Sequence, residues 1–98
     1  MTGTPNQIEL GQQIKASVAR EFDRVANALK TASLRQAGQD LLNTTTAIEI
    51  LEEARSTVMA RQEAGYFIRD WQDLSGQVRD LIVRDPRHKA MRVARGAT

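Results

Sequence analysis

The stretch IKASVAREFDRVANALKTA, residues 14–32, carries the clearest structural signal of the chain. Apolar side chains recur in it at steps of 4, 4, 3, 4 and 3 residues, at Ile14, Val18, Phe22, Val25, Leu29 and Ala32. The mean step of 3.6 residues is the period of a straight amphipathic α-helix. We therefore expect a helix over about residues 6–32 with its apolar stripe against a core.

A second helix is expected over about residues 46–63. Thr46 followed by Glu49 fits the capping box, in which the two side chains satisfy backbone amides at a helix start. The segment before it, SLRQAGQDLLN at residues 33–43, reads either as a bent continuation of the first helix or as a separate short helix. Ser33 and Gly38 weaken a helix there, but no proline ends it.

A third helix is expected over about residues 66–84, after Gly65 closes the second helix in a left-handed conformation. Its apolar stripe has steps of 4, 3, 4 and 3 residues, and the mean of 3.5 is that of a coiled-coil seam. The pair Asp85-Pro86 ends the helix, because proline disfavours the α conformation in the residue before it. Residues 87–96 then form either one or two further turns or a mobile tail.

The fold expected from these patterns is all-α. Pro5 and Pro86 are the only prolines, and the residues between them are rich in strong helix formers. We predict a small antiparallel three-helix bundle with coiled-coil-like packing over residues 6–84, with or without a short extra helix at about 33–43. A flexible N-terminus at residues 1–5 and a basic C-terminal tail at residues 85–98 complete the expected organisation.

Composition narrows the function classes. The 98 residues leave room for one domain, with 14 Lys and Arg against 12 Asp and Glu. With no cysteine and one histidine there is no disulfide framework, zinc finger or thiol nucleophile. No apolar run reaches the roughly 18 residues of a membrane span, and the N-terminus lacks a secretory signal. We expect a cytoplasmic protein without membrane association.

Candidate catalytic sets are weak. A metal site would need Glu49 and Glu52 to meet acidic residues of the third helix such as Asp73, and an anion-binding pocket would need Arg20, Arg55 and Gln77 to converge. Nothing in the spacing of either set requires convergence. We therefore predict no catalytic residue, no metal site and no small-molecule cofactor.

The third stripe and the C-terminal end are the two candidate interaction surfaces. Aromatic residues cluster in the stripe, and they serve equally as core or as interface anchors. The predicted interface comprises Tyr66, Phe67, Trp71, Leu74, Val78 and Leu81. Residues 84–98 have a net charge of +4, and the candidate residues for an acidic or nucleic-acid partner are Arg84, Arg87, Lys89, Arg92 and Arg95.

Two functions remain open from the sequence. The first is a non-enzymatic helical assembly or adaptor protein, acting through homo-oligomerisation or by docking to a larger protein. The alternative is a nucleic-acid-associated protein that uses its basic end for non-specific contacts with DNA phosphates. The same basic end would also suit an acidic protein surface, including that of a neighbouring copy.

Overall fold

The computed structural model describes the backbone of residues 1–96 and the side chains of residues 1–91. This part of the chain forms five α-helices: α1 (Pro5–Ser33), α2 (Gly38–Met59), α3 (Ala64–Asp70), α4 (Leu74–Val83) and α5 (Pro86–Gly96). Within residues 1–96 there is no strand, only an isolated bridge between Thr2 and Glu63. The all-α prediction is confirmed, but the helices expected to number three are five.

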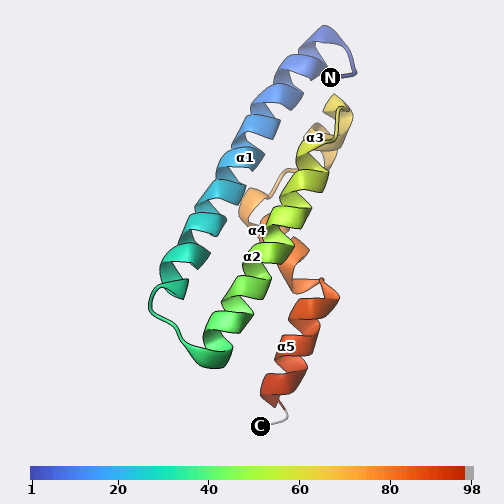
Figure 1. The fold of residues 1–98 in the computed structure, drawn as a ribbon. Helices are drawn as coiled ribbons and strands as arrows, with labels where there is room; N and C mark the ends of the chain where they lie inside the picture. Colours follow the sequence, from blue (N-terminus) through green and yellow to red (C-terminus); the bar gives the residue numbers. More distant parts are fainter. Residues whose placement is uncertain (97–98) are drawn as a thin grey trace.

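The two long helices form an antiparallel hairpin: the chain follows α1, turns at residues 34–37 and returns along α2 (Figure 1). α3 contacts α1, and α4 contacts both α1 and α2, so the second half of the chain covers one side of the hairpin. α5 then contacts α2 and α4. The resulting molecule is elongated, with extents of 53 × 24 × 19 Å.

Helix α1 begins and ends within one residue of the predicted bounds. Thr4 is its N-cap, and a capping box joins it to Gln7: Gln7 N donates to Thr4 Oγ1 at 3.3 Å, and Thr4 N donates to Gln7 Oε1 at 3.0 Å. Pro5 occupies the first helical position, where a missing amide hydrogen has no cost. The prediction rested on the 3.6-residue apolar stripe, and the capping box at Thr4 is an additional local signal that it did not use.

Helix α2 begins eight residues earlier than predicted, at Gly38 rather than at residue 46. The predicted capping box is not formed, because the hydroxyl of Thr46 donates to the carbonyl of Leu42 at 3.0 Å inside the helix. Thr45 makes the equivalent bond to Leu41 at 2.9 Å. Residues 33–43 are therefore neither a bent continuation nor a separate helix. Gly38 starts α2 with a left-handed φ of 59°.

The predicted third helix is two helices, because the chain breaks between Asp70 and Leu74. Trp71 leaves the helical conformation with φ −117° and ψ 54°. Asp73 then caps α4, its Oδ1 accepting a hydrogen bond from the amide of Gly76 at 3.2 Å. Gly65 does not close α2: it lies inside α3 and has no left-handed φ. The predicted stop before Pro86 is confirmed, since α4 ends at Val83.

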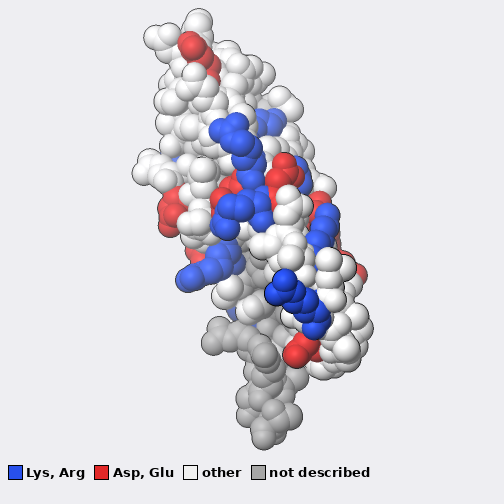
Figure 2. Space-filling model, turned by 90° about the vertical axis from the view of Figure 1, so that its left-hand side faces the viewer, with Lys and Arg blue, Asp and Glu red and all other residues white. Residues whose placement is uncertain are grey.

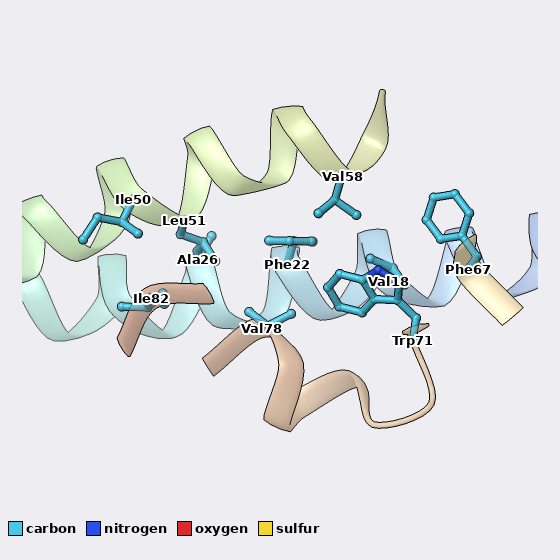
Figure 3. Packing of buried hydrophobic residues seen from close by; sticks show 10 residues of the cluster. All are labelled: Val18, Phe22, Ala26, Ile50, Leu51, Val58, Phe67, Trp71, Val78 and Ile82. Carbon is cyan, nitrogen blue, oxygen red and sulfur yellow. The ribbon is translucent and has the colours of Figure 1, made fainter. Parts of the chain in front are cut away.

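The core lies between the hairpin and the α3–α4 pair. Figure 3 shows Phe22 of α1 at its centre, between Val58 of α2 and Val78 of α4. The ring of Trp71 lies 6.0 Å from that of Phe22, centroid to centroid. Ten buried residues form this cluster: Val18, Phe22, Ala26, Ile50, Leu51, Val58, Phe67, Trp71, Val78 and Ile82.

The N-terminal residues are tied to the turn between α2 and α3. Thr2 N donates to Gln62 O at 2.8 Å, and Ala64 N donates to Thr2 O at 3.0 Å. Beside this turn α1 and α3 approach each other at Gly11, where a Cβ atom would lie only 2.9 Å from the Cα of Ala64. The absence of a side chain at Gly11 is what allows α3 to sit directly on α1.

Candidate protein-docking groove

The six residues of the predicted interface stripe hold the molecule itself together. Three of them lie in the chain's own core, with Phe67 and Val78 at 0 % and Trp71 at 5 % exposure. The remaining three are partly buried against the same core: Tyr66, Leu74 and Leu81. The stripe therefore fixes α3 and α4 to the hairpin, and only its three partly buried members retain surface for a partner.

The predicted basic surface is interrupted by an internal ion-pair network at Arg87. Its Nη1 and Nη2 donate to the two carboxylate oxygens of Glu53 on α2 at 2.7 and 3.3 Å. Its Nε and Nη2 also donate to the carboxylate of Asp85, both at 3.0 Å. These hydrogen bonds hold the pKa of Asp85 below its ordinary value and raise the pKa of Arg87. Arg87 thus fastens α5 to α2.

Of the other four predicted basic residues, the structure describes the side chains of two. Arg84 and Lys89 are exposed to solvent. Arg84 Nε donates to the carbonyl of Asp80 one turn earlier at 3.3 Å. The side chains of Arg92 and Arg95 lie outside the described residues. Two of the five predicted positions are therefore seen as accessible cations.

The three residues that an anion-binding pocket would need, Arg20, Arg55 and Gln77, are each bonded to a different neighbour. The guanidinium of Arg20 donates to Ser17 at 2.9 Å along α1. Arg55 of α2 forms an ion pair with Asp23 of α1. Gln77 donates instead to a backbone carbonyl at the end of α3. Arg20 is thus bonded within α1, whereas Arg55 and Gln77 each join two different helices.

The residues that a metal site would need, Glu49, Glu52 and Asp73, are not gathered into one cluster. Asp73 is used as the N-cap of α4. Among residues 1–91 no three His, Asp or Glu side chains lie close enough together to hold a metal ion. The other two residues that this metal site would need, Glu49 and Glu52, lie on α2.

A groove of about 360 Å³ lies between α1 and α4. Its apolar lining comes from both helices and consists of Val25, Ala28, Leu29 and Ile82. Ser75 and Gly76 at the start of α4 and the side chains of Arg24 and Arg79 complete the lining. A second hollow of about 490 Å³ shares Ala28 and continues along α1, lined by Asn27, Ala28, Thr31, Ala32 and Arg35. We call these two hollows together the α1–α4 groove.

The two arginines of the α1–α4 groove differ in their bonding. Arg24 donates to Glu21, with Nε to Oε1 at 2.9 Å, and this hydrogen bond lowers the pKa of Glu21. The pair lies within one helix turn, and the Arg24 side chain is 63 % exposed. Arg79 is exposed and forms no ion pair with any side chain of residues 1–91. Because exposed pairs are weak, both cations are accessible to an incoming acidic group.

Charge and apolar surface are also distributed unevenly over the rest of the molecule. Figure 2 views the side on which α1 lies and shows Lys and Arg side chains along most of its length, with Asp and Glu among them. Three leucines are exposed: Leu10 at 46 %, Leu34 at 85 % and Leu42 at 60 %. Leu34 and Leu42 flank the turn between α1 and α2. Both ends of the α1–α2 turn thus present apolar side chains to solvent.

The α1–α4 groove was missed by the sequence reasoning. Val25 and Leu29 belong to the predicted core stripe of α1, and the structure leaves both of them only partly buried. Ala28 lies beside that stripe and was not assigned to any surface. The available signal was the width of the apolar arc, which is extended by Ala28 beyond what one neighbouring helix covers.

No helix within residues 1–96 combines the length and apolarity that crossing a membrane requires. Comparisons with protein-family models, with curated proteins and with solved structures find no match to this chain.

Proposed function

We propose that this chain is a non-enzymatic helical assembly or adaptor protein that docks another protein in the α1–α4 groove. The observation that carries the proposal is the apolar lining at Val25, Ala28, Leu29 and Ile82, which the described helices leave open. Apolar surface that lies beside charged side chains is typical of protein-binding sites, with an apolar centre and a polar rim. Docking is therefore the activity that this surface supports best.

The shape of the groove favours a helix as its occupant. The walls of its first hollow come from α1 and α4, and the second hollow is lined by α1 and Arg35 of the following turn. An amphipathic helix binds such a surface by laying its apolar face along it. From Arg24 to Arg35 the groove follows α1 for about 16 Å, or roughly three turns of a bound helix. Arg24 and Arg79 favour acidic residues beside the apolar face of that helix.

Nucleic-acid binding receives less support. Phosphate binding depends on several cations that are not neutralised nearby. Arg87, at the centre of the predicted basic surface, is already bound to Glu53 and Asp85. The apolar lining of the α1–α4 groove has no role in phosphate contacts. We therefore treat DNA binding as an outcome that the experiment must distinguish.

The experiment follows groove methyl groups by NMR in the full-length chain. Val25, Leu29 and Ile82 report on the α1–α4 groove, and Val58 in the core serves as an internal reference. Three probes are added separately: an acidic amphipathic helical peptide, the same peptide with its acidic residues changed to lysine, and a short DNA duplex. We expect the acidic peptide alone to shift the groove methyls. Shifts caused by the duplex, or by none of the three probes, would overturn the docking function.

Two variants that replace an alanine of α1 with glutamate form a matched pair of test and control. Ala28→Glu places a carboxylate on the groove lining and should abolish the peptide-induced shifts by filling the groove and repelling acidic residues. Ala16→Glu makes the same change at another exposed position of α1, one that lines none of the hollows described above. It should leave peptide binding unchanged. Equal loss in both variants would show that the peptide binds elsewhere.

A further inference from the structure

We propose that the occupant of the α1–α4 groove is helix α2 of a second copy of this chain, so that copies join head to tail. This inference rests on the docking function proposed above and names the partner. It is drawn from two surfaces on the same molecule: the α1–α4 groove and an acidic strip on the outer side of α2. The two surfaces have opposite charge and share no residue.

The acidic strip follows α2 at steps of 3, 4, 3 and 4 residues, as one face of a helix does. Its members are Leu42, Thr45, Glu49, Glu52 and Ser56. All are exposed except Glu52, which is half-buried. At 100° per residue, their mean direction lies about 180° from that of the buried side chains of α2. The strip therefore faces away from the hairpin and the core.

Glu49 and Glu52 have no cationic partner within the described chain. Neither forms an ion pair with a side chain of residues 1–91, whereas the neighbouring Glu53 is bound by Arg87. Leu42 precedes these glutamates by two turns of the same strip and is 60 % exposed. The strip thus combines one exposed apolar side chain with two carboxylates that no cation of residues 1–91 binds, and its charge is opposite to that of Arg24 and Arg79 at the α1–α4 groove.

The lengths and charges of the two surfaces correspond. From Leu42 to Ser56 the acidic strip is about 21 Å long, and the α1–α4 groove follows α1 for about 16 Å. Residues 5–37, which include α1, carry five basic and three acidic residues, a net charge of +2. Helix α2 carries one basic and four acidic residues, a net charge of −3. Opposite fields of this kind steer association and fix its orientation.

The same charges disfavour a symmetric dimer. Two acidic strips facing each other would bring Glu49 and Glu52 against their own copies, and two grooves facing each other would do the same with Arg79. Like charges placed opposite each other cost affinity. Pairing the strip of one copy with the groove of the next avoids both repulsions. Such a heterologous contact leaves one free strip and one free groove, so it continues into a ring or a filament.

The test uses two variants that each disable one surface. Glu49→Lys/Glu52→Lys reverses the acidic strip and leaves the groove intact. Ala28→Glu/Arg79→Glu disables the groove and leaves the strip intact. Sedimentation velocity over a concentration series should show wild-type assemblies larger than a dimer, and both variants should be monomeric with association weakened at least about tenfold. An equimolar mixture of the two variants should associate again, because the intact strip of the groove variant fits the intact groove of the strip variant.

Glu9→Lys is the control for the charge reversal. It makes the same substitution at an exposed glutamate that lies outside both surfaces, and it should assemble like the wild type. Circular dichroism of each variant verifies that the helices are retained. A wild-type chain that stays monomeric, or a strip variant that assembles like the wild type, would overturn the inference. If the acidic peptide still shifts the groove methyls in that case, the docking function stands and only the identity of the partner is wrong.

Discussion

Replacing Gly11 with alanine tests the close contact between α1 and α3 at Ala64. The added Cβ would lie 2.8 Å from the Cβ and 2.9 Å from the Cα of Ala64, and 2.9 Å from the sulfur of Met1. Carbon atoms in ordinary contact are about 3.5 Å apart or more, so α3 must move by about 0.6 Å. The Met1 side chain can swing aside, but the backbone of Ala64 moves only if α3 does.

Gly65→Ala is the matched control, since it is the same substitution in a helix with no atom within 4 Å of the new Cβ. Alanine is preferred over glycine in helices by up to about 1 kcal/mol, and that gain is common to both variants. Crowding of a packed contact costs about 1–3 kcal/mol. We therefore expect Gly11→Ala to be less stable than Gly65→Ala by about 2 kcal/mol.

The assay is urea unfolding followed by the fluorescence of Trp71, the only tryptophan, which is 5 % exposed in the folded chain. A difference of about 2 kcal/mol corresponds to about 8–16 °C in melting temperature for a domain of this size. If Gly11→Ala is as stable as Gly65→Ala, α1 and α3 do not pack at the described distance. The account of why the sequence has glycine at this position would then be wrong.

Three further predictions concern other parts of the fold. Leu51→Ala should lower the free energy of unfolding by about 2–5 kcal/mol because the side chain is fully buried, while Leu34→Ala, at 85 % exposure, should change it by less than about 0.5 kcal/mol in the same urea experiment. Gly38→Ala should lower the free energy of unfolding by about 1–2 kcal/mol in thermal unfolding, because φ at this position is left-handed. No atom lies within 4 Å of the added Cβ, so this backbone strain is the only cause. An NMR titration of Asp85 should give a pKa below its ordinary 3.8, rising toward that value in Arg87→Gln. Because the pKa of Asp85 is lowered on folding, its ionised carboxylate stabilises the fold at pH values above the ordinary pKa, and this contribution is lost as the pH falls through the folded pKa. An unchanged titration in the variant would exclude Arg87 as the cause.

The parts of the fold that the sequence predicted are those with local causes. The 3.6-residue stripe that predicted α1 acts within that helix, as does the capping box at Thr4, which the prediction did not use. The stop at Asp85-Pro86 is equally local. Such signals are readable because the residues that interact are neighbours in the sequence.

The errors arose where one residue had two possible uses. Thr46 can cap a helix or bond to the carbonyl four residues earlier, and its place inside α2 decides for the second. Asp73 fits the polar face of one long helix as well as the N-cap of α4. The break there is favoured because Trp71 reaches Phe22 in the core. Packing across the molecule decides between such uses, and helical periodicity carries no information about it.

The candidate site was predictable only in part, because both of its surfaces depend on which helices become neighbours. Arg87 was predicted as part of a surface for an acidic or nucleic-acid partner, and its hydrogen bond to Glu53 joins positions 34 residues apart, which spacing along the chain does not indicate. The α1–α4 groove likewise needs α4 to turn away from the lower part of α1. Composition and spacing predicted an interaction protein without the α1–α4 groove as its binding surface, and the surface proposed here depends on the tertiary arrangement.

The elongated hairpin has a practical consequence for sizing the protein. Its radius of gyration is 15.7 Å, whereas a compact chain of 98 residues has one of about 13 Å. By the same scaling, a compact protein with this radius would have about 1.8 times the mass. A single molecule should therefore elute from a gel-filtration column earlier than a globular protein of its own mass. Calibration against globular standards would therefore overstate the mass of the monomer, and a mass from sedimentation or light scattering is needed to tell it from a dimer.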